Sequence, residues 1–301
     1  MDYDTAVQAM FRVMPEDAPL PIPVVTADPA RRLRDAFEPI ALHPVWCRRT
    51  NEALAKLGLN FLTGYVWSRA AALGEPPAPV VVAAFGVFEP NLIAALYEEG
   101  RRVCGRTEVL AARTEATTAS LAAVLEGTDV TGAVAVLRRG VEAADGTGRP
   151  LFAGLRSLDW PEEPMGQLWR ACEALREYRG DCHLAACISS GLDPVEMNIL
   201  SELWLGMPLG SHTATFGWPQ DAIAGAASRL ERRDLVADGT ITPAGHRFRD
   251  DLEARTDAQQ QDVMDAVGDD TEAVVEMLDD WSAACIAAGA YPPDPYKRAG
   301  G

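Results

Sequence analysis

Most of the chain consists of segments in which apolar residues recur every three or four positions, separated by short breaks at glycine or proline. Such spacing is typical of helices with one buried face. It predicts a helix that begins behind Asp28 and ends near Pro39, because the residue before a proline avoids the α region. The same spacing predicts helices over 51–57, 61–73, 91–99, 107–125 and 131–144. The run 80–85 is apolar throughout and fits a strand or a helix; we favour a buried helix.

Proline and glycine also mark larger units of the chain. Residues 1–26 are rich in proline, which predicts an extended arm over the surface. The turn sequence Asp-Gly-Thr-Gly at 145–148 ends the series of helices in the first half. We therefore expect a helical domain over 27–148 and a second domain over 149–301.

The second half opens with a long amphipathic helix. Asp159 and Glu162 have the spacing of a capping box, which predicts a helix from there to about Arg179. Gly180 is expected to interrupt it, and 183–190 to form a further short helix. Asp193-Pro-Val-Glu has the same capping spacing, with proline at the first helical position, and starts the next helix.

A pattern with a known counterpart follows. The phrase Leu-Glu-Arg-Arg-Asp-Leu-Val at 230–236 ends a helix, 237–240 is a tight turn, and Ile-Thr-Pro-Ala-Gly at 241–245 opens another helix. This resembles the winged helix of MarR-type regulators. With Tyr-Arg-Gly-Asp-Cys-His at 178–183 and Ala-Gly-Ala-Tyr-Pro near the end, the chain resembles an actinobacterial family of mostly unassigned function. The resemblance implies a mainly α fold: a helical N-terminal domain joined to a MarR-like winged-helix domain with a small β-wing.

The charge of the chain argues against the DNA binding that a winged helix usually implies. With 27 basic and 44 acidic residues the net charge is −17, and residues 161–301 carry −14 of it. The positions that would read bases, 220–226, contain Gln220 as the one suitable side chain, and the turn 238–240 has no Lys or Arg. We therefore expect a small-molecule ligand and regard DNA as an unlikely partner.

The densest group of reactive side chains is Arg179-Gly-Asp181-Cys-His183. His183 would act as a general base or acid, Asp181 would orient its imidazole, and Arg179 would bind an anionic substrate group. In the alternative interpretation Arg179 and Asp181 form a structural ion pair and His183 is a buried polar residue. Both interpretations remain open from the sequence.

A second polar and aromatic group lies in the first half. Its members are candidate ligand-binding residues: Glu38, His43, Trp46, Tyr65 and Arg69. Tyr178, in the second half, is a further candidate. We expect the two groups to face one cavity between the domains, where binding sites often form. The alternative is an aromatic core in which Arg69 pairs with Glu38. His212 and His246 are interpreted as structural or solvated.

Other chemistry finds little support. The six cysteines and four histidines have no metal-ligand spacing, and no phosphate-binding loop or dinucleotide fingerprint is present, so we expect neither metal nor cofactor. The acidic N-terminus and the absence of a long apolar run predict a cytoplasmic protein without a membrane contact. The residues 262–280 have one apolar side, which fits either a helix that forms a homodimer or a pair of amphipathic helices exposed to solvent.

The sequence thus favours a small-molecule-binding protein on a winged helix that no longer reads DNA. Within that class we expect a cofactor-independent enzyme using acid-base chemistry, or an accessory factor of specialised metabolism. The alternative is a MarR-like, ligand-responsive transcriptional regulator.

Overall fold

The computed structural model describes residues 1–11 and 28–300. Within them the chain is mainly helical, and its two short strands form one antiparallel hairpin. The α-helices are α1 (Tyr3–Met10), α2 (Pro29–Ala41), α3 (His43–Trp46), α4 (Arg48–Lys56), α5 (Phe61–Ala70), α6 (Ala78–Phe85), α7 (Pro90–Val103), α8 (Arg106–Val124), α9 (Thr131–Ala143), α10 (Pro150–Arg156), α11 (Pro164–Ser189), α12 (Pro194–Trp204), α13 (Gln220–Arg232), α14 (Pro243–Ala258), α15 (Gln261–Val267), α16 (Thr271–Ala287) and α17 (Pro295–Gly300). The expected mainly α fold with a small β-wing is confirmed, as is the helix over the run 80–85.

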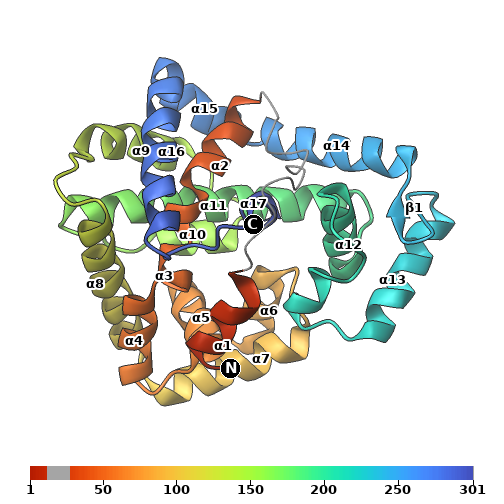
Figure 1. Ribbon diagram of the computed structural model, residues 1–301, viewed down its shortest axis with the longest axis horizontal. Coiled ribbons are helices and arrows are strands. Elements are labelled where there is room, and N and C mark those ends of the chain that lie inside the picture. The colour runs from red at the N-terminus through yellow and green to blue at the C-terminus, as the bar shows by residue number, and fades with distance from the viewer. Residues whose placement is uncertain (12–27, 301) are drawn as a thin grey trace.

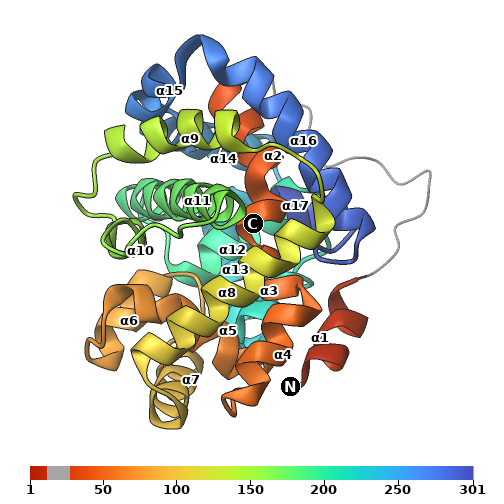
Figure 2. The same ribbon diagram turned by 90° about the vertical axis from the view of Figure 1, so that its left-hand side faces the viewer.

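Helix α11 is the central element of the fold. It crosses the middle of the molecule, with α8 and α9 at one end and α12 at the other (Figure 1). Seen from the side, α9 lies above it and α5 and α7 lie below (Figure 2). Residues Leu168, Trp169 and Cys172 of α11 are fully buried in a core shared with α2, α8, α9, α15 and α16. Its last turns belong to a second core, formed with α12, α13 and α14.

The first core joins residues from both sides of the expected domain boundary. It contains Phe37 and Leu137 from the first half, and Leu168 and Leu278 from the second. Helix α16 packs against α2, although more than 200 residues separate them in sequence. In the described residues the turn at 145–148 therefore does not separate two hydrophobic cores.

The N-terminal half departs from the expectations at two points. Residues 3–10 of the expected extended arm form α1, whose N-cap is Asp2, while 12–27 lie outside the described residues. Helix α2 continues through Pro39 to Ala41 instead of ending there. Proline has no N–H to donate to the carbonyl of Asp35, but this carbonyl accepts a hydrogen bond of 2.6 Å from Arg298 Nε. A tertiary contact thus compensates for the bond that proline removes.

Two further corrections concern α11. Its N-cap is Glu163, and 159–163 precede the helix, so the capping box expected at Asp159 does not form. Gly180 does not interrupt the helix, which is continuous over 26 residues. An internal glycine costs about 1 kcal/mol relative to alanine. The burial of α11 on both sides of Gly180 outweighs this cost, since the two cores flank that position.

The winged-helix segment follows the expected order. Asp193 caps α12 in a capping box with Glu196, and α13 leads into β1 (Val236–Ala237) and β2 (Thr240–Ile241). Val236 pairs with Ile241 and Ala237 with Thr240. The two turn residues Asp238 and Gly239 have φ values of 49° and 72°, the left-handed conformation that a two-residue hairpin of this type requires.

Candidate functional site

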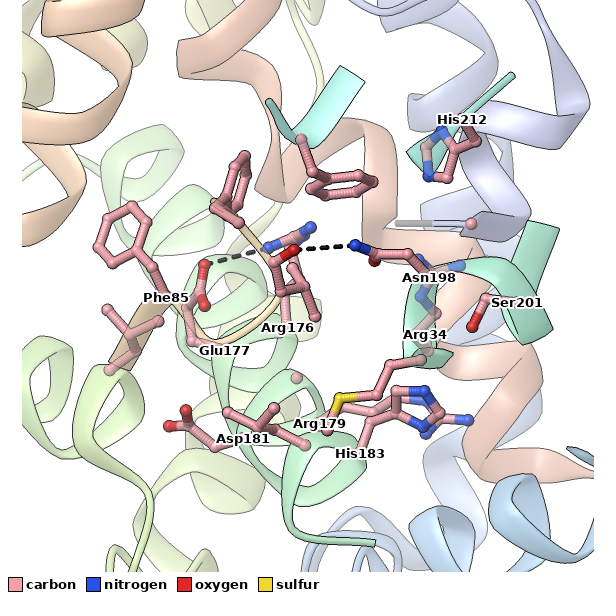
Figure 3. A pocket seen from close by; sticks show the side chains of 18 of the residues that line it. Arg34, Phe85, Arg176, Glu177, Arg179, Asp181, His183, Asn198, Ser201 and His212 are labelled. Carbon is pink, nitrogen blue, oxygen red and sulfur yellow. Dashed lines mark hydrogen bonds and ion pairs between the residues drawn. The ribbon is translucent and has the colours of Figure 1, made fainter. Parts of the chain in front are cut away.

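A cavity of about 200 Å³ lies where α11 meets the winged-helix segment. Helices α2 and α11 supply most of its charged side chains, and α12 supplies part of the opposite wall (Figure 3). Apolar side chains of 84–88, α11, α12 and the short 3-10 helix before α13 also line it, among them Ala84, Phe85, Val87, Phe88, Leu184, Met197 and Phe216. The cavity therefore combines a mostly apolar wall with charged groups, as small-molecule sites do.

Gly180 leaves part of this space open. It lies within α11, lines the cavity, and a Cβ atom placed on it would have no atom within 4 Å. Gly180 is also exposed, so a larger residue would project into the open space beside it. The glycine that was expected to break the helix instead widens the site.

The first charged group of the wall centres on Glu253 of α14. Its carboxylate accepts hydrogen bonds from Arg31 at 2.9 Å and from Arg249 at 2.7 Å, and it also pairs with Arg179. Burial alone would raise the pKa of Glu253, but the charges of these three arginines outweigh it and hold the pKa well below its usual range. Arg179 makes a second ion pair of 2.7 Å, with Asp257. Asp181, the partner of Arg179 in the alternative interpretation, does not form an ion pair with it, since Arg179 pairs with Glu253 and Asp257.

The second charged group centres on Glu177 of α11. Arg69 holds it in a two-pronged ion pair of 2.6 and 2.9 Å, and Arg176 lies at 3.1 Å. Burial opposes ionisation of Glu177, but the charges of Arg69 and Arg176 lower its pKa to about 2. Arg176 also reaches Glu38, at 3.1 Å. Arg69 thus pairs with Glu177, and the alternative pairing with Glu38 is wrong.

Asp181 and His183 point to different elements. They are two residues apart on a continuous helix, which separates them by about 200° around its axis. Asp181 accepts a hydrogen bond of 3.1 Å from the backbone N–H of Phe152 in α10. Burial raises the pKa of Asp181 to about 7, although this hydrogen bond works in the opposite direction. Asp181 therefore does not orient His183, and that expectation is wrong.

The hydrogen bonds of His183 define its tautomer. Its Nδ1 lies 3.0 Å from the hydroxyl of Thr256, which donates its only proton to the carbonyl of Leu252 at 2.8 Å. Nδ1 must therefore carry a proton and donate it, so that Nε2, 3.5 Å from the thiol of Cys187, is the acceptor. Burial, assisted by the charge of Arg249, lowers the pKa of His183 to about 3. The imidazole is neutral at pH 7 and lines the cavity.

The other predicted ligand-binding residues divide into two sets. Tyr65 and Arg69 line the cavity, and Glu38 lies behind Arg34 and Arg176, with which it pairs. The remaining three do not line it: Tyr178, His43 and Trp46.

These three side chains have structural partners elsewhere. The Tyr178 hydroxyl donates to the carbonyl of Gln259 at 2.9 Å. His43 Nε2 lies 2.9 Å from the hydroxyl of Ser120, and burial lowers the pKa of His43 to about 4. Trp46 packs between Phe11 and Phe61, with ring centroids 5.8 Å from each. The two predicted groups therefore share a cavity only in part.

Several residues of the wall were not predicted. His212, expected to be structural or solvated, lines the cavity, and burial lowers its pKa to about 3. Asn198 and Ser201 of α12 face the same space (Figure 3). The amide of Asn198 donates to the carbonyl of Val87 at 2.8 Å and so ties α12 to the segment after α6. No local pattern in the sequence distinguishes these residues, since the fold brings them together.

Helix α13 precedes the β-hairpin, as the DNA-reading helix of a winged helix does, but Arg229 in it and Arg233 directly after it are bound elsewhere. Arg229 pairs with Asp193 and Glu196 at the start of α12, and Arg233 donates to the carbonyls of Gly191 and Ser190 at 3.2 Å. The exposed positions of α13 are Gln220, Asp221, Ala224, Ser228, Glu231 and Arg232. That face carries two acids and one base.

The fold defines a helical protein with a winged helix-turn-helix segment and a partly open cavity beside it. The chain belongs to a helix-turn-helix family, whose sequence model matches residues 30–292. Neither the curated proteins nor the solved structures contain a significant match. In the described residues no helix combines the length and apolar character needed to span a bilayer, and no group of three or more His, Cys, Asp and Glu side chains could hold a metal ion.

Proposed function

We propose that this protein binds a small molecule in the cavity beside α11, and that its winged helix forms a wall of the binding site. The observation that carries the proposal is the cavity itself, in which an open face at Gly180 adjoins aromatic side chains and charged groups. Such sites take a ligand through apolar contact and use a few polar groups to orient it. Helix α12 contributes Met197, Asn198 and Ser201, so that the winged helix and the ligand share a surface.

The electrostatics support a winged helix that does not read DNA. A DNA-binding helix needs cations that face phosphate groups. Here Arg229 is bound to the start of α12 and Arg233 to the carbonyls at the end of α11, and the exposed side of α13 carries a net negative charge. The rival proposal is a ligand-responsive transcriptional regulator, which the contribution of α12 to the cavity favours. A gel-shift measurement with DNA from the neighbourhood of its own gene distinguishes the two. Specific sub-micromolar binding at physiological salt would support the regulator.

An enzyme on this scaffold would transfer protons through Asp181. A general acid or base works best when its pKa is near the working pH. Burial brings the pKa of Asp181 to about 7, whereas that of His183 is about 3. Asp181 is therefore the preferred acid-base group of the proposed cofactor-independent chemistry, and His183 becomes a neutral hydrogen-bonding residue of the wall.

The binding proposal is tested by filling the cavity from Gly180. N-Phenyl-1-naphthylamine, a neutral aromatic probe that fluoresces in apolar sites, should bind the native protein. Gly180→Leu should abolish this binding while thermal stability is kept or increased, because leucine is the better helix former and the added Cβ has no neighbour within 4 Å.

The matched control is Gly132→Leu. Gly132 is an exposed glycine of α9 at which a Cβ also has no neighbour within 4 Å. This variant should bind the probe like the native protein. Equal probe binding by the two variants and the native protein would exclude the cavity as the binding site.

A further inference from the structure

Four rings in mutual contact form an aromatic wall of the cavity: Tyr65, Phe85, Phe88 and Phe216. Phe88 lies at its centre. Its ring centroid is 4.9 Å from that of Phe216, 5.9 Å from that of Tyr65 and 6.1 Å from that of Phe85. Tyr65, Phe88 and Phe216 are only partly buried, so each ring keeps accessible surface. A ligand in this cavity therefore meets aromatic rings from three different elements of the fold.

Hydrogen bonds of the backbone hold Phe88 in place on both sides. The carbonyl of Val87, directly before it, accepts a hydrogen bond of 2.8 Å from the amide of Asn198 in α12. The N–H of Glu89, directly after it, donates to the carbonyl of Phe216 at 2.9 Å. Because the backbone is fixed on both sides of the ring, the aromatic wall is formed before a ligand binds. A ligand that packs against it consequently loses little affinity to the ordering of these side chains.

The hydrogen bond to Val87 also determines which atom of the Asn198 amide is left for a ligand. Only the amide nitrogen can donate to a carbonyl, so Nδ2 is bound to Val87 and Oδ1 remains as an acceptor. Within the described residues no group donates to Oδ1, and this oxygen is not among the unpaired polar atoms that packing encloses completely. Asn198 lines the cavity and faces it (Figure 3). Its Oδ1 is therefore an acceptor that a ligand can reach.

The carboxylates of the cavity do not offer the same acceptor beside the rings. Both oxygens of Glu177 and both oxygens of Glu253 already accept hydrogen bonds from arginines. Asp181 accepts its hydrogen bond from α10. The partner of Asn198, in contrast, is the residue that directly precedes Phe88. Asn198 thus places an unused acceptor next to the aromatic wall.

From these observations we infer that the ligand is an aromatic compound with an O–H or N–H group, as in a phenol or an aryl amine, and that Asn198 Oδ1 accepts the hydrogen bond of this group. This ligand class rests on the proposed function of the cavity and makes it more specific. Edge-to-face and offset contacts between rings stabilise an aromatic ligand beyond the burial of its apolar surface. The size agrees, because an apolar cavity of about 150 Å³ holds benzene and this partly open cavity measures about 200 Å³.

Three competitors of the bound probe N-phenyl-1-naphthylamine separate the ring from the donor. 1-Naphthol has both features, 1-methoxynaphthalene keeps the rings and the oxygen but lacks the O–H, and decahydro-1-naphthol keeps the hydroxyl group but is saturated. 1-Naphthol should displace the probe at a concentration at least about fivefold lower than 1-methoxynaphthalene, which leaves Asn198 Oδ1 without a donor. It should also act at a concentration at least about threefold lower than decahydro-1-naphthol, which cannot make ring contacts with the aromatic wall.

The outcomes distinguish the ligand class from the proposed function. If N-phenyl-1-naphthylamine does not bind, the proposed function fails and the ligand class fails with it. If the probe binds and 1-methoxynaphthalene displaces it as readily as 1-naphthol does, the requirement for a donor is wrong. If decahydro-1-naphthol is as effective as 1-naphthol, the requirement for an aromatic ring is wrong.

Substitutions test whether Asn198 is the acceptor. Asn198→Ala should reduce the advantage of 1-naphthol over 1-methoxynaphthalene to less than about twofold. The carbonyl of Val87 stays paired in this variant, because the indole Nε1 of Trp218 also donates to it at 2.9 Å. The readout is a ratio of two competitors, so a change in cavity size largely cancels. The comparison in the native protein stands whether or not the variant folds.

The matched control is Trp218→Phe. It removes the other hydrogen bond to the same carbonyl, from a residue that does not line the cavity, and should keep the full advantage of 1-naphthol. Ser201→Ala should keep it as well, although Ser201 faces the cavity from the same helix as Asn198. An advantage that persists in Asn198→Ala, or that is lost in Ser201→Ala or in Trp218→Phe, would overturn the assignment of the acceptor to Asn198.

Discussion

The buried carboxyl group of Asp181 should make the protein less stable as the pH rises, and Asp181→Asn should remove this dependence. Burial raises the pKa of Asp181 from 3.8 to about 7, so the folded chain disfavours the ionised form. Above pH 7 this difference corresponds to a loss of ~4 kcal/mol in the free energy of unfolding. At pH 5 the folded group is protonated and the unfolded group is largely ionised, and the loss is only ~1.5 kcal/mol. Asparagine is uncharged and its side-chain oxygen can still accept the hydrogen bond from Phe152.

Urea unfolding of the native protein and of Asp181→Asn at pH 5, 6, 7 and 8 measures this effect. The stability advantage of the variant should grow from pH 5 to pH 8 by ~3 kcal/mol, with unchanged dependence on urea concentration. Asp129→Asn is the control: hydrogen bonds from Thr131 lower the pKa of the exposed Asp129 below 3.8, so the stability of this variant relative to the native protein should be the same at all four pH values. An advantage of Asp181→Asn that is the same at all four pH values would refute the argument.

Three further predictions concern the buried polar groups. His183→Ala should lower the free energy of unfolding by ~1–3 kcal/mol in urea, because Thr256 loses its hydrogen-bond donor; an unchanged stability with lost ligand binding would instead favour a functional role. Glu253→Gln should cost ~3–5 kcal/mol in thermal or urea unfolding, since three arginines lose their common negative charge. All six cysteines are buried, and burial raises the pKa of Cys187 to about 11. A thiol reagent at pH 8 should therefore react slowly with the native protein. In urea, which unfolds the chain, it should react rapidly with all six thiols.

Local signals in the sequence predicted the elements whose formation depends on residues close to one another in the chain. Apolar spacing located most helices, and Asp193 and Glu196 form the capping box that their spacing indicated. The predictions were wrong where contacts between residues far apart in the sequence determine the local structure. Pro39 lies inside α2 because Arg298, 259 residues further on, satisfies the carbonyl that proline leaves unpaired. Nothing near Pro39 in the sequence reveals this contact.

The candidate site was predicted only in part for the same reason. Arg179, Asp181 and His183 do line one cavity with Tyr65 and Arg69. Proximity in the sequence nevertheless predicted interactions between Asp181 and its neighbours Arg179 and His183 that do not form. A continuous α11 turns these side chains to different partners, on α10 and on α14.

The charged wall of the cavity is fixed when the chain folds, and this bears on how it would bind. Glu253 joins Arg31 of α2, Arg179 of α11 and Arg249 of α14, so one carboxylate connects three elements of the fold. The side-chain entropy of these arginines is therefore lost on folding and not on binding. The guanidinium group of Arg249 is held over the Trp204 ring. A ligand that contacts this wall consequently needs no further ordering of these side chains, and substitutions of Glu253 should weaken folding and ligand binding together.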